Sequence, residues 1–76
     1  MTGTIVKHSV RIAGHQTSIS LEQKFWTILQ EIALRENVSI NKLITNIDAT
    51  RSGNMSSTLR LFVLEDLERR LSSNMD

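Results

Sequence analysis

The chain has 76 residues, a net charge of +1 at pH 7, 39% hydrophobic residues and no cysteine. This length fits one domain, near the size at which a single hydrophobic core is marginal, and without cysteine neither disulfides nor a thiolate metal site can stabilise it. Oligomerisation is the remaining common way for so small a domain to bury enough apolar surface. No apolar run approaches the roughly 18 residues of a membrane span. The first residues lack the basic and apolar regions of a signal peptide, so we expect a cytoplasmic protein without membrane association.

The N-terminal end carries a net positive charge. Residues 1–21 contain Lys7, Arg11 and two histidines, His8 and His15, but no acidic residue. In a dimer this local charge would double and favour contact with phosphates. A solvated basic end without a partner is the alternative. Because the histidines have no cysteine or carboxylate near them in sequence, we expect no metal and no cofactor.

Two short segments of alternating polarity flank Gly14. Residues 9–12 alternate as a half-buried strand does. In residues 16–21, Ile19 and Leu21 point one way, with Thr17 on the same side, and the polar side chains point the other way. The first segment could pair with the second as a hairpin or could remain a flexible arm. We predict an N-terminal arm over residues 1–8 and a β segment over residues 9–21.

Two amphipathic helices are predicted within residues 22–50. Ser20 and Gln23 have the form of a capping box, which places the first helix start near Glu22. Asn37 is expected to end that helix in a left-handed conformation, and Ser39 to cap the second. Trp26 lies beside the first apolar stripe, which predicts partial burial at a dimer interface. The apolar positions follow helical spacing: Phe25, Ile28, Leu29, Ile32 and Ala33, then Ile40, Leu43, Ile44 and Ile47.

A third helix is predicted over residues 55–72, after a break at Gly53. Its apolar stripe is Leu59, Phe62, Val63, Leu67 and Leu71. Leu61 and Leu64 lie off that stripe, and such a surplus is what a subunit interface would bury. Arg69 and Arg70 are expected at a solvated end, balanced by Glu65, Asp66 and Glu68.

The order strand, helix, Asn37-Val38-Ser39 turn and helix, over residues 16–47, resembles the ribbon-helix-helix DNA-binding proteins. The stretches 9–22 and 53–64 are similar to a bacterial subgroup with an additional C-terminal helix. The resemblance implies an α+β fold in a single domain over residues 1–76. It also implies an intertwined homodimer, in which the strand over residues 16–21 pairs with its symmetry mate to form an antiparallel β-ribbon.

The resemblance further implies a double-stranded DNA partner and a set of contact residues. The outward side chains of the ribbon, Gln16, Ser18 and Ser20, would contact bases. The phosphate contacts would be Lys7, Arg11, His15, Ser39, Ile40, Asn41 and Lys42, since a helix start offers free N–H groups and partial positive charge. Serines discriminate bases poorly, so Arg11 and His15 could supply part of the reading.

The implied function is transcription regulation, as a repressor or an antitoxin-like autoregulator. The sequence has no Gly-x-Ser-x-Gly elbow and no evident paired carboxylate site, so we expect no enzymatic activity. The competing hypothesis is a dimeric protein-interaction module that binds another protein through the apolar C-terminal helix and has little affinity for DNA.

Overall fold

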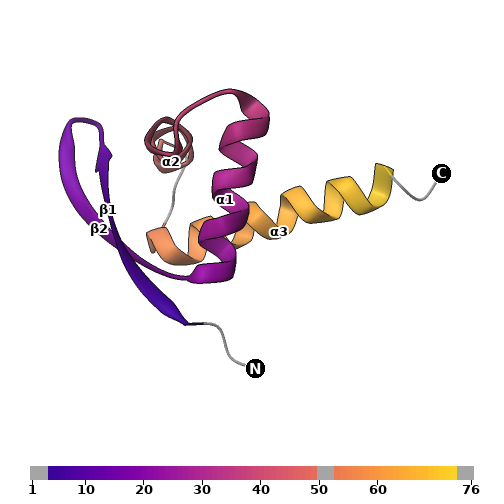
Figure 1. Cartoon of the computed structure of the whole chain (residues 1–76), viewed down its shortest axis with the longest axis horizontal. Helices are drawn as coiled ribbons and strands as arrows, with labels where there is room; N and C mark the ends of the chain where they lie inside the picture. Colours follow the sequence, from indigo (N-terminus) through magenta and orange to yellow (C-terminus); the bar gives the residue numbers. More distant parts are fainter. Residues whose placement is uncertain (1–3, 50–52, 74–76) are drawn as a thin grey trace.

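The computed structural model describes residues 4–49 and 53–73, which form a β-hairpin followed by three helices (Figure 1). The strands are β1 (Ile5–Ile12) and β2 (His15–Glu22), and the helices are α1 (Gln23–Glu36), α2 (Ile40–Asp48) and α3 (Met55–Ser73). Figure 1 shows α2 beside the hairpin, and α3 running past α1 and projecting on the side away from the hairpin. The predicted α+β class and the additional C-terminal helix are confirmed.

The hairpin is closed by a two-residue turn at Ala13 and Gly14. Both residues have positive φ, 51° and 83°, as a type I′ turn requires. The strands are antiparallel, and the register runs from Ile12 opposite His15 to Ile5 opposite Glu22. The ribbon is therefore confirmed, but its second strand comes from the same chain rather than from a symmetry mate.

The start of β1 corrects the predicted N-terminal arm. The strand begins at Ile5, four residues before the predicted start at Ser9. Val6 pairs with Leu21 and His8 with Ile19, so residues 5–8 are held by the ladder. Of the two alternatives for the first segment, the structure has the hairpin.

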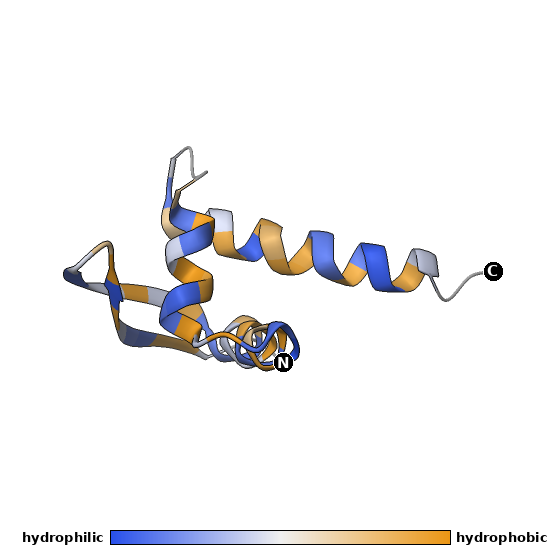
Figure 2. Cartoon of the chain, turned by 90° about the horizontal axis from the view of Figure 1, so that it is seen from above, coloured by the Kyte–Doolittle hydropathy of each residue, from blue (hydrophilic) through white to orange (hydrophobic). Residues whose placement is uncertain are grey.

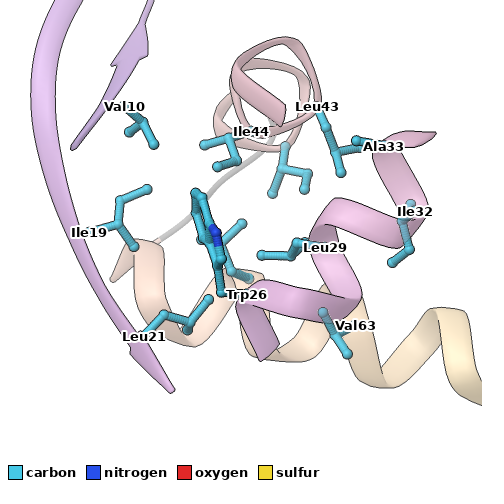
Figure 3. Close-up of a cluster of buried hydrophobic side chains, with 12 residues drawn as sticks. Val10, Ile19, Leu21, Trp26, Leu29, Ile32, Ala33, Leu43, Ile44 and Val63 are labelled. Carbon is cyan, nitrogen blue, oxygen red and sulfur yellow. The ribbon is translucent and has the colours of Figure 1, made fainter. Parts of the chain in front are cut away.

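The inner face of the hairpin closes the hydrophobic core within one chain. Val10, Ile19 and Leu21 are buried there against the three helices (Figure 3). The helices contribute Leu29, Ile32, Ala33, Leu43, Ile44, Ile47, Leu59 and Val63, all of them buried. Because β1 and α3 cover the short helices, these residues do not need a second copy of the chain in order to leave water.

Trp26 belongs to this core. The sequence predicts partial burial at a dimer interface, and this prediction is corrected. The Trp26 side chain is only 7% exposed and stacks on His8, with ring centroids 3.8 Å apart and planes 7° from parallel. The two rings meet because His8 alternates onto the inner face of β1, beside the first turn of α1. The His8 Nε2 atom is buried and has no hydrogen-bond partner among the described residues.

The helix termini confirm two of three predicted signals. Asn37 ends α1 with φ 61°, and the Ser39 hydroxyl accepts a hydrogen bond from the Lys42 N–H at 3.0 Å. The capping box at Ser20 is wrong, because the strand continues through Glu22, which is the N-cap residue and makes no side-chain cap. The Ser20 carbonyl instead accepts from the Ser56 hydroxyl of α3 at 2.6 Å.

The predicted solvated end of α3 is confirmed for Arg69 and Arg70, which are exposed and pair with Asp66, but it is wrong for Asp66 itself. Asp66 is 2% exposed, and its carboxylate accepts from Arg35 of α1 at 2.6 Å. Arg69 and Arg70 lie 3.3 Å from the same carboxylate. The hydrogen bond from Arg35 holds the pKa of Asp66 below its usual range. This cluster joins α3 to the C-terminal end of α1.

Within the two described ranges, no helix combines the length and apolar character needed to cross a lipid bilayer.

Candidate nucleic-acid interface

The outer face of the hairpin, defined here by its outward cross-strand pairs, gathers residues that are far apart in sequence. Paired residues of an antiparallel ladder point to the same side. The pairs on this face are Arg11–Gln16, Ser9–Ser18, Lys7–Ser20 and Ile5–Glu22. All of these side chains are exposed except Glu22, which is partly buried. The structure therefore brings the predicted base contacts Gln16, Ser18 and Ser20 together with Lys7 and Arg11.

The acidic residue of the outer face is neutralised. Glu22 lies at the end remote from the turn, and its carboxylate accepts from Arg60 of α3 at 2.9 and 3.3 Å. These hydrogen bonds lower the pKa of Glu22. Between the turn and Lys7, the face carries only neutral polar and basic side chains. The charged side chains of this stretch, Lys7 and Arg11, are thus both positive, which favours attraction to phosphates.

The start of α2 lies at the edge of β1, beside Arg11. The backbone N–H of Arg11 donates to the Asn41 side-chain oxygen at 3.4 Å, which links β1 to the first turn of α2. In that turn the Ser39 hydroxyl accepts from Lys42, while the first amides of a helix have no acceptor within it. The predicted phosphate residue Asn41 thus contacts Arg11, and Ser39, Ile40 and Lys42 belong to the same cap and first turn of α2.

His15 is the predicted contact that the structure separates from the others. It pairs with Ile12 and alternates onto the inner side of the hairpin with Thr17. Both side chains are exposed there and line a hollow with Asp48 of α2. His15 is therefore not part of the outer face.

Ser9 is a further residue of the outer face and is not among the predicted contacts. It stands opposite Ser18, at the middle of the face. The alternation in residues 9–12 predicts that Ser9 and Arg11 lie on one side of the strand. It does not predict which residues of β2 stand opposite them, because the two-residue turn determines that register.

A second exposed feature lies on α3. Leu61, Leu64 and Leu71 are 57%, 48% and 64% exposed. Figure 2 shows apolar positions continuing along α3 towards its C-terminal end. Leu61 also lines an open hollow between α2 and α3, together with Phe62 and Ile47. We call Leu61, Leu64 and Leu71 the leucine face of α3.

Comparison with known proteins agrees with this geometry. The family model of the ribbon-helix-helix domain matches residues 5–67, from the start of β1 into α3. Among solved structures, an uncharacterized protein from Bordetella pertussis Tohama I superposes with a TM-score of 0.80 at 28% sequence identity. The match covers 95% of this chain and 62% of that one, so this chain spans less than two thirds of its length. No curated protein matches. Because the family model spans most of the sequence, the chain belongs to the ribbon-helix-helix family.

Proposed function

We propose that the chain is a DNA-binding transcriptional regulator that inserts the outer face of its hairpin into the major groove. The observation that carries the proposal is the composition of this face, with two basic and four neutral polar side chains over the pairs Lys7–Ser20, Ser9–Ser18 and Arg11–Gln16. Ribbon-helix-helix proteins typically bind DNA in transcription regulation, and this chain shares their domain. A two-stranded ribbon is narrow enough for the major groove, which is about 12 Å wide.

The N-terminus of α2 would hold a phosphate beside the inserted hairpin. Ser39 fixes the first turn of this helix, and the free amides of Ile40 and Asn41 would face the phosphate oxygens with Lys42 close by. Phosphate contacts set the position of the hairpin on the duplex, and base contacts give the specificity. In the cell, we propose a cytoplasmic repressor or an antitoxin-like autoregulator.

We propose that the functional unit is a homodimer formed through the leucine face of α3. The ribbon and the core are complete within one chain, so the apolar surface left for a partner is mainly on the helices. A two-fold contact uses the same surface on both subunits, which an exposed helix face provides. Two copies would then carry two hairpins, each able to enter a groove.

The competing function is a protein-interaction module, and the exposure of Leu61, Leu64 and Leu71 favours it. A titration of a mixed-sequence DNA duplex at two salt concentrations separates the two. The DNA-binding function predicts an affinity that falls steeply between about 50 and about 200 mM salt, with a log–log slope near 0.9 per phosphate contact. Absence of binding at the lower salt concentration would leave the interaction module as the better account.

A further inference from the structure

The pair formed by Arg11 and Gln16 differs from every other pair of the outer face. Both side chains are long and end in a planar group with several hydrogen-bonding atoms. The pairs Ser9–Ser18 and Lys7–Ser20 contain short hydroxyls or a single ammonium, and Ile5 stands opposite a carboxylate bound by Arg60. The bidentate hydrogen-bonding groups of this face are therefore concentrated at the end next to the turn.

Arg11 has no carboxylate partner in the part of the chain that the structure describes. The other described arginines, Arg35, Arg60, Arg69 and Arg70, each contact an acidic side chain. No hydrogen bond involves the Arg11 guanidinium among the described residues, and the side chain is exposed. Its five N–H donors remain available for a ligand.

The backbone of Arg11 is nevertheless held in place. Arg11–Gln16 is a non-hydrogen-bonded pair of the ladder, as are the other pairs of the outer face, so the Arg11 N–H points away from β2 and donates to the Asn41 oxygen. In such pairs the facing side chains lie closer together than in the hydrogen-bonded pairs. The neighbouring turn at Ala13 and Gly14 fixes the register on the other side. The two planar side chains consequently start from adjacent, restrained positions.

We infer that Arg11 is a base-reading residue, paired with Gln16, so that β1 contributes to specificity as well as β2. The inference rests on the proposed DNA-binding function and decides between the two roles considered for Arg11, phosphate contact and base reading. A guanidinium donates to both O6 and N7 of guanine, and a glutamine amide matches N6 and N7 of adenine. The ligand is therefore duplex DNA with a guanine and a neighbouring adenine presented in the major groove.

Selection of binding sites from a randomised duplex library tests the inference on the full chain. The parent protein is expected to select sites that contain a guanine. Arg11→Ala should lose the preference at that base pair by roughly 5-fold to 150-fold while still binding non-specific DNA. Arg11→Lys should weaken the preference although it keeps the charge. The matched control Lys7→Ala should lower the affinity for all sequences about equally, with its thermal unfolding compared with that of the parent.

The outcomes distinguish the inference from the function on which it rests. If Arg11→Ala selects the same sites as the parent and binds every sequence more weakly by one factor, Arg11 contacts phosphate and the inference is wrong. Selection without any guanine preference by the parent would also overturn it. If the parent protein binds no duplex at low salt, the proposed function itself fails.

Discussion

The backbone N–H of Arg11 and the side-chain oxygen of Asn41 are 3.4 Å apart, although 30 positions separate them in the sequence. This contact joins the strand that carries the basic residues to the helix start that would hold a phosphate. The spacing between the two parts of the proposed DNA-binding surface therefore depends on it, together with the packing of β1 on α2.

Replacement of Asn41 by alanine should weaken DNA binding more than folding. The hydrogen bond is long and exposed, so its loss is expected to cost about 0.5–1 kcal/mol of unfolding free energy or less. Without this hydrogen bond, core packing still holds β1 on α2, but the distance between Arg11 and the phosphate site is less restrained. Fluorescence anisotropy with labelled duplex and thermal denaturation measure the two effects. Asn46→Ala, at another exposed position of α2, is the control, and equal binding by the two variants would contradict the prediction.

A pair of substitutions at Ser39 separates the helix cap from the phosphate site. Ser39→Ala removes the acceptor for the Lys42 N–H and should lower the unfolding free energy by about 1 kcal/mol. Ser39→Asp keeps a good cap and a favourable interaction with the helix dipole, but its negative charge would repel a phosphate. We expect Ser39→Asp to fold as well as the parent and to bind DNA more weakly. Parent-like DNA binding by Ser39→Asp would show that no phosphate sits there.

Asp66 should make the stability of the protein depend on pH in the acidic range. Arg35 lowers the pKa of this carboxyl in the folded state, so the folded state binds fewer protons than the unfolded state. The stabilisation is present above the unfolded pKa of about 3.9 and is lost as the pH falls through the folded pKa. Urea denaturation at a series of pH values should give a smaller decrease at low pH for Asp66→Asn than for the parent. Parallel curves for the two proteins would contradict the role of Asp66.

Replacement of Leu64 by glutamate tests the proposed dimer surface. The side chain is 48% exposed on α3, so the charge should leave the fold intact and disrupt a contact made by the leucine face. Sedimentation equilibrium should show a dimer for the parent and a monomer for Leu64→Glu. Leu34→Glu on α1, at a leucine that is 82% exposed, provides a matched control that should remain a dimer. A parent that is monomeric at high concentration would exclude this interface.

Local signals in the sequence were sufficient for the helix boundaries around the tight turn. Asn37 and Ser39 act through their own backbone and the next residues, so their roles can be inferred without tertiary information. The failure at Ser20 has a tertiary cause, because pairing with Lys7 extends the strand past the apparent capping box. The start of β1 was missed because Ile5 and Val6 are consecutive apolar residues and break the alternation.

Contacts between side chains of different elements could not be predicted from the sequence. The stack of His8 on Trp26 and the position of Ser9 opposite Ser18 both follow from the hairpin register. Asp66 is an exception, because it follows Leu59 and Val63 at helical spacing and so lies on the apolar side of α3. An acidic residue on a buried face needs a cationic partner, which Arg35 provides.

Mapping of amide chemical shifts during titration with duplex DNA would locate the DNA contact surface on the protein itself. We expect the perturbed amides to cluster on the outer face of the hairpin and at the first turn of α2, in residues 7–11, 16–20 and 39–42. Perturbations confined to the leucine face of α3, or none at low salt, would contradict this expectation.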